Sequence, residues 1–374
     1  MEALLQGITA LSWQQAGMIF IGLVLIYLAV AKDYEPALLL PMGFGAILVN
    51  IPFSSALDQM VGGQVFHGAV ELLFQTGIAT ELFPLLVFIG VGAMMDFSPV
   101  LERPGMALFG LTAQAGIFLT MGLALWMGFD LKEAGAIGII GAADGPTSIY
   151  VSSRFAPHLL GPISVAAYSY MALVPVIQPP VIRLLTTKQE RQITMPRVES
   201  RSVSKRAKIL FPICVTIIVS LLAPASATLI GFLMFGNLLR ESGVVDRLAR
   251  GAENELTNIT TILLGLAIAA TMTGDKFLRP QTLFIMGMGL VAFVLDTAVG
   301  VLSAKLANVF LKNKINPMIG AAGISAFPMA SRIVQKMGAQ EKPGNFLLMQ
   351  AAGANVAGQI GSVVAGGLLL AFLS

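Results

Sequence analysis

The sequence predicts an all-α membrane protein that crosses the bilayer about ten times. Of its 374 residues, 56% are hydrophobic and only 11% are charged, whereas soluble domains carry about 25% charged residues. Apolar runs long enough to cross a bilayer recur along the chain, for example over 17–31, 106–127 and 345–373. These runs do not alternate between apolar and polar residues, as the strands of a transmembrane barrel do.

The basic residues predict how the chain is oriented in the membrane. The stretch from Arg183 to Lys208 holds eight Lys or Arg residues and two Glu residues, so we expect it to face the cytoplasm. It divides the chain into a first membrane repeat over 1–186, a basic cytoplasmic loop over 187–208 and a second membrane repeat over 209–374.

The first half is predicted to contain five spans and one re-entrant hairpin. The spans are 17–31, 37–52, 83–95, 106–127 and 160–182. The first run lacks a basic segment before it and a small-residue cleavage site after it, so we expect a span rather than a signal peptide. The last span must end inside at Arg183 and therefore begins outside. Residues 134–158 thus enter and leave on the outer side, as a re-entrant hairpin does.

The second half repeats this pattern with the opposite orientation. Its predicted spans are 209–222, 224–240, 257–274, 282–300 and 345–373. Residues 315–343 are flanked by lysines and arginines at both ends, which predicts a second hairpin that enters from the cytoplasm. Lys276 and Arg279 fall on the outer side in this arrangement and count against it. Two oppositely oriented hairpins in an inverted repeat are typical of transporters with an ion or substrate site near the membrane midplane.

Each predicted hairpin contains a polar motif that starts with Gly-Ala-Ala and ends with Ser-Arg. The two motifs read GAADGPTSIYVSSR over 141–154 and GAAGISAFPMASR over 320–332. Non-helical backbone at this depth is tolerated where it is buried in protein or lines a wet cavity. Its free carbonyls need a partner there, and a cation is one such partner.

The first motif carries an acid, Asp144, where a buried charge is costly. Pro146 frees a carbonyl upstream, and Thr147 and Ser148 add hydroxyl oxygens. Carboxylate, carbonyl and hydroxyl oxygens form a set suited to Na⁺ or H⁺. The alternative is that Asp144 caps the half-helix that begins at the Gly-Pro break.

The second motif offers neutral oxygens. Asn316 can present an amide oxygen to a cation, or it can cap a helix beside Pro317. The Ser325 hydroxyl can face a cation or bond back to its own helix. Arg154 and Arg332 close the two motifs, each as a carboxylate clamp or as an anchor at the membrane interface.

Of the further polar residues in predicted spans, three have two interpretations each and two are assigned to packing. Tyr168 and Tyr170 can relay a proton or belong to an aromatic belt. Asp296 is a second intramembrane acid, either a proton relay or a hydrogen-bonded structural group. Asn355 and Ser362 lie among small residues and are assigned to helix packing.

Several function classes are disfavoured by what the sequence lacks. Its single cysteine cannot form a disulfide within the chain, and neither histidine has a second His or Cys at metal-ligand spacing. No phosphate-binding Gly-Lys-Ser/Thr loop is present, so ATP is not expected to drive this chain directly. No Met-Lys-Met tripeptide is present to carry biotin, so any biotin has to arrive on a partner.

The two motifs and their surroundings resemble one family over essentially the whole chain. The segments that carry the likeness read GAADGPTSIYVSSRFAPHLLGPISVAAYSYMALVPVIQPPVIRLLTTKQER, NPMIGAAGISAFPMASR, ELFPLLVFIGVGAMMDF and NFLLMQAAGANVAGQIGS. They are similar to the membrane β subunit of the biotin-dependent sodium-pumping decarboxylases. That family acts on oxaloacetate, methylmalonyl-CoA, glutaconyl-CoA or malonate.

The resemblance implies a division of labour between subunits. A soluble carboxyltransferase moves CO₂ from an acid to biotin on a carrier, and the β subunit then decarboxylates carboxybiotin, consumes a proton and exports Na⁺. Position by position, the resemblance assigns catalysis to Asp144, Tyr170 and Arg332. It assigns cation binding to Asp144, Asn316, Gly320 and Ser325, with Asp144 and Ser325 as direct Na⁺ ligands. It assigns contact with carboxybiotin to Arg332. Na⁺ and partner-borne carboxybiotin are the expected cofactors.

The same resemblance implies partners and a location. We expect a biotin carrier, a carboxyltransferase, a small membrane subunit of the γ/δ type and a homo-oligomer, in the cytoplasmic membrane of a bacterium or archaeon, and no nucleic acid. The short start of the chain favours a decarboxylase of an acyl-CoA. The competing functions are a Na⁺-coupled secondary carboxylate transporter and a membrane anchor without transport.

Overall fold

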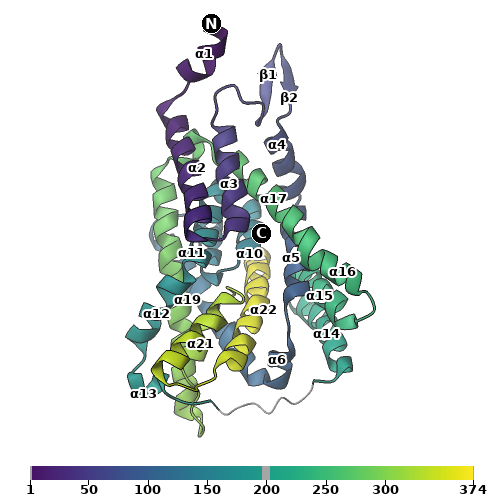
Figure 1. Ribbon diagram of the computed structural model, residues 1–374, viewed down its shortest axis with the longest axis vertical. Coiled ribbons are helices and arrows are strands. Elements are labelled where there is room, and N and C mark those ends of the chain that lie inside the picture. Colours follow the sequence, from purple (N-terminus) through teal and green to yellow (C-terminus); the bar gives the residue numbers. More distant parts are fainter. Residues whose placement is uncertain (1, 196–202, 374) are drawn as a thin grey trace.

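The computed structural model describes residues 2–195 and 203–373, most of them helical (Figure 1). Arg197 and Arg201 of the predicted basic loop lie outside the described residues. Four helical stretches are long and apolar enough to cross a membrane, Trp13–Lys32, Pro104–Trp126, Pro280–Phe310 and Leu348–Leu373. Two bent pairs raise the number to six if each is one span: Ala69–Ile78 with Leu82–Met94, at 63°, and Pro157–Ala172 with Val174–Leu185, at 69°.

An all-α membrane protein is therefore confirmed, whereas the number of about ten spans stays a prediction.

The first half of the chain contains α1 (Glu2–Thr9), α2 (Trp13–Lys32), α3 (Pro36–Val49), β1 (Gln59–Val61), β2 (Gln64–Phe66), α4 (Ala69–Leu73), the π-helical turn η1 (Phe74–Ile78), α5 (Leu82–Met94), α6 (Ser98–Glu102), η2 (Pro104–Met106), α7 (Ala107–Ala113), α8 (Ala115–Trp126), α9 (Leu131–Gly138), η3 (Ile139–Ala142), α10 (Gly145–Phe155), η4 (Pro157–Leu159), α11 (Leu160–Ala172), α12 (Val174–Leu185) and α13 (Lys188–Arg191).

The second half contains longer helices and fewer elements. They are α14 (Lys205–Leu222), η5 (Pro224–Ser226), α15 (Ala227–Ser242), α16 (Asp246–Gly251), the π-helical turn η6 (Ala252–Leu256), α17 (Thr257–Ile268), η7 (Ala269–Thr271), α18 (Gly274–Phe277), α19 (Pro280–Phe310), α20 (Met318–Ala321), α21 (Met329–Glu341) and α22 (Leu348–Leu373). Helix α1 and the hairpin of β1 and β2 lie at one end of the molecule, and α13 lies at the other (Figure 1). The hairpin pairs Gln59 with Phe66 across a turn of two glycines, Gly62 and Gly63, at positive φ.

Several helices begin where the sequence provides a cap. Ser12 with Gln15 and Asp130 with Glu133 form capping boxes at the starts of α2 and α9. In each box the cap side chain accepts a backbone N–H of the first turn, and the third residue's side chain bonds back to the cap. These starts therefore follow from local sequence alone.

Three predicted spans are interrupted in the structure. Residues 106–127 divide at Gln114 into α7 and α8, and residues 160–182 divide at Leu173, just before the proline that opens α12. Residues 257–274 were expected to be one helix, but α17 ends at Ile268 and a turn follows. The Asn50 side chain at the end of α3 holds this turn, donating to the Met272 carbonyl at 2.8 Å and accepting from the Gly274 amide at 2.9 Å.

Corresponding elements of the two halves make corresponding contacts. In each half the first two long helices pack together, α2 with α3 and α14 with α15. The second helix of each half also packs against the third of the other half, α3 with α17 and α15 with α5. Helix α22 lies along α7, and α19 lies along α11 and α12.

The contact between α5 and α15 depends on glycine. A Cβ at Gly92 would lie 1.8 Å from the carbonyl oxygen of Leu233, and one at Gly236 would lie 1.9 Å from that of Ile89. Both neighbours are backbone atoms, which cannot move without shifting a helix. The bare glycine backbones therefore set how closely these two helices approach, as small residues do between membrane helices.

We expect Gly236→Ala to lower the free energy of unfolding by about 1–3 kcal/mol, because the methyl group forces α5 and α15 apart. The matched control is Gly287→Ala in α19, where no atom lies within 4 Å of the new Cβ. That change should be neutral or raise stability by up to about 1 kcal/mol, because alanine is the better helix former. Thermal unfolding of the purified variants in detergent measures both effects, and equal midpoints would contradict the packing argument.

Candidate functional site

The first polar motif interrupts a helix in the protein interior. Helix α9 continues into η3, Ala143 adopts the left-handed conformation with φ 56°, and α10 begins after Asp144. The Asp144 carboxylate accepts the Thr147 amide at 3.3 Å as an N-cap. Pro146 lies in the first turn of α10, where its missing N–H removes no helical bond. Asp144 is thus a helix cap, which was one of its two interpretations.

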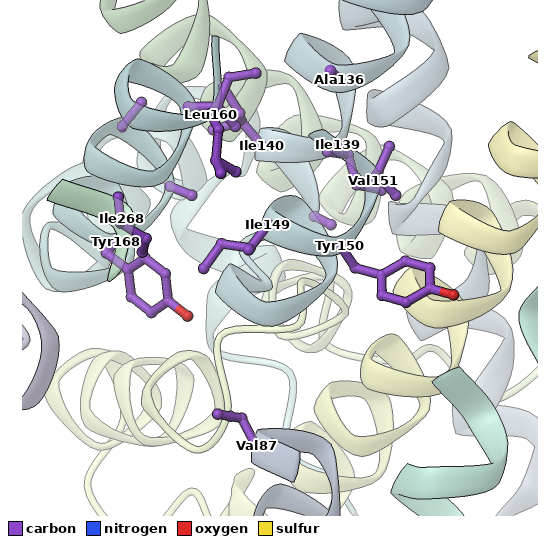
Figure 2. Packing of buried hydrophobic residues seen from close by; sticks show 14 of the residues in the cluster. Val87, Ala136, Ile139, Ile140, Ile149, Tyr150, Val151, Leu160, Tyr168 and Ile268 are labelled. Carbon is purple, nitrogen blue, oxygen red and sulfur yellow. The ribbon is translucent and has the colours of Figure 1, made fainter. Parts of the chain in front are cut away.

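Apolar side chains enclose this break. Ile139, Ile140, Ile149 and Val151 are fully buried around it (Figure 2), and Asp144 itself is only 3% exposed. A carboxylate in such surroundings needs hydrogen-bond donors or a cation, because leaving it unpaired costs several kcal/mol. The partners of Asp144 therefore determine what this break can do.

Three side-chain donors converge on one oxygen of Asp144. Its Oδ2 accepts the Thr147 hydroxyl at 2.6 Å, the Ser362 hydroxyl at 2.7 Å and the Gln359 amide at 2.5 Å. Among the described residues, its Oδ1 accepts only the long bond from the Thr147 amide. Two of the three donors come from α22, more than 200 residues away in the sequence.

The second polar motif meets the first at this place. Residues 322–328 form a non-helical connection between α20 and α21, and the Ser325 amide donates to the Ala142 carbonyl at 2.9 Å. The Ser325 hydroxyl donates to the Gly358 carbonyl of α22 at 2.8 Å. The structure therefore brings Asp144 and Ser325 together, through backbone atoms and α22 rather than by direct side-chain contact.

Glycines allow three backbone segments to converge here. A Cβ at Gly358 would lie 2.1 Å from the Gly323 carbonyl oxygen, and one at Gly323 would lie 2.3 Å from that of Phe109. The Gln114 side chain, at the break between α7 and α8, donates to the carbonyls of Gly110, Gly323 and Gly358 at 3.1–3.3 Å. One amide group thus joins the second motif, α22 and α7.

Two neutral side-chain oxygens near this junction have no hydrogen-bond donor in the described part of the chain. They are Gln114 Oε1 and Asn355 Oδ1, and both are buried. Asn355 uses its amide nitrogen to bond the Ile324 carbonyl at 2.6 Å. Buried polar atoms are nearly always paired in proteins, so these oxygens are available to a ligand.

The two tyrosines of α11 have different surroundings. The Tyr168 ring covers Gly145, where a Cβ would lie 2.1 Å from its Cζ atom. The Tyr170 hydroxyl instead donates to the Met286 carbonyl of α19 at 2.5 Å. The assignment of Tyr170 to catalysis, which the resemblance implies, stays a prediction, and the structure adds Tyr168 as a tyrosine in contact with the first motif.

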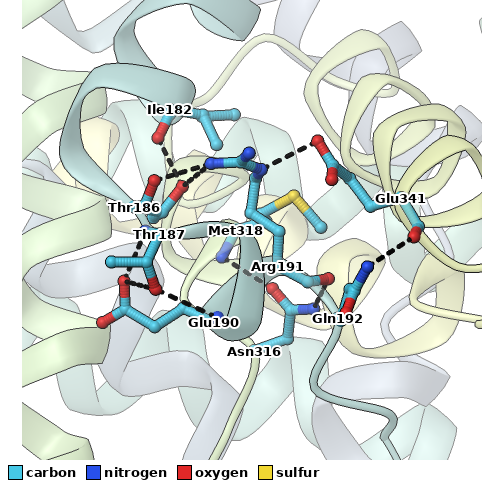
Figure 3. A network of polar contacts seen from close by, with 9 residues as sticks. All are labelled: Ile182, Thr186, Thr187, Glu190, Arg191, Gln192, Asn316, Met318 and Glu341. Atoms are coloured by element: carbon cyan, nitrogen blue, oxygen red, sulfur yellow. Dashed lines mark hydrogen bonds and ion pairs between the residues drawn. The ribbon is translucent and has the colours of Figure 1, made fainter.

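Asn316 lies in a second polar network, which Figure 3 shows. Its amide nitrogen donates to the carbonyls of Arg191 and Ile193 at 2.8 and 2.9 Å, and its amide oxygen accepts the Met318 amide at 3.1 Å. Asn316 thus ties the start of the second motif to the chain after α13. Gly320 contacts the backbone of Gly300 in α19. Neither residue contacts the Asp144 side chain.

Ion pairs complete this second network. Arg191 pairs with Glu341 at 2.8 Å, joining α13 to the end of α21, and Lys305 of α19 pairs with Glu190 at 3.1 Å. Burial alone would raise the pKa of Glu190, but hydrogen bonds from Thr187 and Lys305 outweigh it and lower that pKa. The network holds the second motif, α13 and α19 together at one end of the molecule.

The two arginines that close the motifs differ in their partners. Arg154 forms an ion pair with Glu81 in the turn before α5, so its charge is already matched. Arg332 is exposed on α21, the helix that follows Ser325. Both arginines are exposed, but only Arg154 has an ion-pair partner among the described residues.

Two residues of the site were not predicted from the sequence. Ser362 was assigned to packing and Gln359 was not singled out, although both contact Asp144. A signal was present, because Asn355, Gln359 and Ser362 recur at a spacing that places them on one face of an otherwise apolar helix. That face is the one turned to both motifs.

Comparison with known proteins gives one family. Residues 14–373 match the family model described as Na⁺-transporting oxaloacetate decarboxylase beta subunit. The methylmalonyl-CoA decarboxylase subunit beta of Veillonella parvula is 50% identical over 98% of this chain and 95% of its own length. The glutaconyl-CoA decarboxylase subunit beta of Acidaminococcus fermentans is also 50% identical, with the same coverage.

A third relative is named for a different substrate. The oxaloacetate decarboxylase beta chain 2 of Salmonella typhi is 47% identical over 100% of this chain and 99% of its own length. Each of these matches covers nearly the whole of this chain. The chain therefore belongs to the family of Na⁺-transporting oxaloacetate decarboxylase beta subunits.

Proposed function

We propose that this chain decarboxylates carboxybiotin carried by a partner protein and couples that reaction to Na⁺ export. The observation that carries the proposal is the junction at Asp144, where a buried carboxylate, the second motif and the polar face of α22 meet. A residue set of this kind between two interrupted helices is what an ion-translocating protein requires.

The atoms around Asp144 suit Na⁺. The set offers one carboxylate, the hydroxyls of Thr147, Ser362 and Ser325, and uncommitted amide oxygens. One negative charge matches one monovalent cation, whereas Ca²⁺ sites usually take several carboxylates. When Na⁺ binds, the hydroxyls that now donate to Asp144 can turn their lone pairs to the ion.

The pattern of helix contacts supports an inverted repeat. We assign the first repeat to 1–186, the basic cytoplasmic loop to 187–208 and the second repeat to 209–374, with hairpins over 134–158 and 315–343. Matching elements of the two halves pack in the same way, and this includes the contacts between the halves, α3 with α17 and α15 with α5. An inverted repeat gives two similar states that open to opposite sides, and differential Na⁺ affinity between them permits coupling.

The reaction also needs an anion site and a proton. Decarboxylation breaks the bond between the biotin nitrogen and the carboxylate, releases CO₂ and leaves nitrogen to take one proton, so each turnover consumes H⁺. We assign the carboxylate of carboxybiotin to Arg332, which is exposed in the first turn of α21. Arginine presents a fork of donors that fits a carboxylate.

Partners and location follow from this assignment. A biotin carrier, a carboxyltransferase and a small γ/δ-type membrane subunit would complete the complex in a prokaryotic cytoplasmic membrane. The relatives named for acyl-CoA substrates align over 367 and 368 residues, whereas the oxaloacetate relative aligns over 429. The 374 residues of this chain are closer to the alignment lengths of the acyl-CoA relatives. This similarity in length supports an acyl-CoA as the substrate that the partner decarboxylates.

We expect Asp144→Asn to abolish Na⁺ binding, because the only carboxylate of the proposed site is replaced by a neutral amide of the same shape. Radiolabelled ²²Na⁺ binding to the purified complex measures this. Asp275→Asn, at an exposed position in α18, is the matched control and should bind Na⁺ normally. Normal binding by Asp144→Asn would remove this carboxylate from the site.

Ser362→Ala should weaken Na⁺ binding about tenfold or more. A hydrogen bond to a charged group contributes roughly 1.5–3 kcal/mol, and 1.4 kcal/mol corresponds to about tenfold. Ser226→Ala is the control, since that serine is also buried but donates to a backbone carbonyl outside the site. An unchanged affinity in Ser362→Ala would show that α22 does not contribute to the ion site.

A Na⁺-coupled carboxylate carrier would share the same architecture, so transport and chemistry must be measured together. In proteoliposomes containing the complex, decarboxylation should drive ²²Na⁺ movement, and avidin should stop both by sequestering biotin. Proteoliposomes with this chain alone should accumulate no labelled carboxylic acid. Uptake of the acid that resists avidin would favour the carrier instead.

A further inference from the structure

A second acid, Asp296, lies inside the protein without any partner. It belongs to α19 and is 0% exposed, and in the described part of the chain neither oxygen of its carboxylate has a hydrogen-bond donor. The sequence left two interpretations open, a proton relay and a hydrogen-bonded structural acid. The structure does not provide the hydrogen bonds that a structural acid would need.

Backbone lies close on two sides of this carboxylate. A Cβ at Gly116 of α8 would lie 1.5 Å from Asp296 Oδ1, and one at Gly141 of η3 would lie 3.1 Å from Oδ2. On these two sides a cation would have to displace backbone, whereas a proton needs no additional volume. A buried carboxylate without partners binds a proton rather than remain charged.

The position of Asp296 connects it to the first motif. Gly141 opens that motif, and Asp144 follows three residues later, a reach of at most about 11 Å of extended chain. Unit charges about 10–15 Å apart, at an effective dielectric of about 20, alter each other's affinities by roughly tenfold. Charge on Asp296 and a cation at Asp144 therefore favour one another.

We propose that Asp296 is a proton-binding site that is neutral in this conformation and releases its proton when a cation occupies the Asp144 site. The inference rests on the proposed Na⁺ site. By linkage, ionised Asp296 strengthens Na⁺ binding by the same factor by which Na⁺ weakens proton binding. The segment η3, which contacts Asp296 and leads to Asp144, lies between the two groups.

No other titratable group on the elements packed against α19 takes the place of Asp296. Those elements, within the described residues, carry Lys132 and Glu133 on α9, Tyr168 and Tyr170 on α11, and Arg183 on α12, whereas α7, α8, η3 and α20 carry none. Lys305 on α19 itself pairs with Glu190 and donates to the Leu185 carbonyl. Asp296 and Asp144 are thus the acids on either side of η3.

The test is to count protons released on Na⁺ binding to the purified complex, by calorimetry in two buffers of different ionisation enthalpy. Asp296→Asn, which mimics the protonated acid, should release fewer protons than wild type, by up to one. Its Na⁺ affinity should equal that of wild type at low pH and fall to about tenfold weaker at high pH, where wild-type Asp296 is ionised. Thr297→Val is the control, because that hydroxyl is buried beside Asp296 and has no partner among the described residues either; it should match wild type.

Equal proton release by wild type and Asp296→Asn, with Na⁺ affinities that follow pH in parallel, would overturn the proposal. Complete loss of Na⁺ binding by Asp296→Asn at every pH would also overturn it, since Asp296 would then be a direct ligand. The Na⁺ isotherm of Asp144→Asn tests the proposed function separately. Asp296→Thr, which can bond back to its own helix, replaces the Asn variant if that one does not assemble.

A second test uses the wild-type complex. Dicyclohexylcarbodiimide, which attacks protonated carboxyls, should label Asp296 at pH 7 and should label it less in the presence of Na⁺. No labelling of Asp296, or labelling that Na⁺ does not reduce, would overturn the proposal.

Discussion

The fold depends on how it accommodates one carboxylate in an apolar interior. Asp144 is buried. Without hydrogen-bond donors or a cation, its charge would destabilise the folded state by more than most single interactions stabilise it. Its donors come from α10 beside it and from α22 at the far end of the chain. The acid therefore adds a contact between the two halves of the protein, and any cation that replaces these donors must alter that contact.

Glycine makes the contact geometrically possible. Three backbone segments converge beside Asp144, and at Gly323 and Gly358 a Cβ would meet a carbonyl oxygen. Close backbone approach brings carbonyls of three segments together, and the single side chain of Gln114 bonds to one carbonyl of each segment. The same feature places many oxygens around a small volume, which is what a cation needs and what an ordinary helix interface lacks.

Local signals predicted much of this arrangement, and long-range contacts were missed. The break at Ala143–Asp144 follows from Gly, Asp and Pro in sequence, and the apolar runs gave the helical membrane class. The interruption near Ala269 was missed because Asn50 holds it from another helix. Ser362 was assigned to packing because small neighbours suggest it, and a partner more than 200 residues away leaves no local trace. The polar face of α22 was the available clue.

The central claim is that Na⁺ binds at Asp144 between the two motifs. Experimental structures of the complex in Na⁺ medium and in Na⁺-free choline medium would test it most directly. The account predicts cation density in contact with the Asp144 carboxylate in Na⁺, with the Thr147 and Ser362 hydroxyls turned toward the ion. Cation density elsewhere, with Asp144 still bonded to Gln359 and Ser362 in both media, would contradict it.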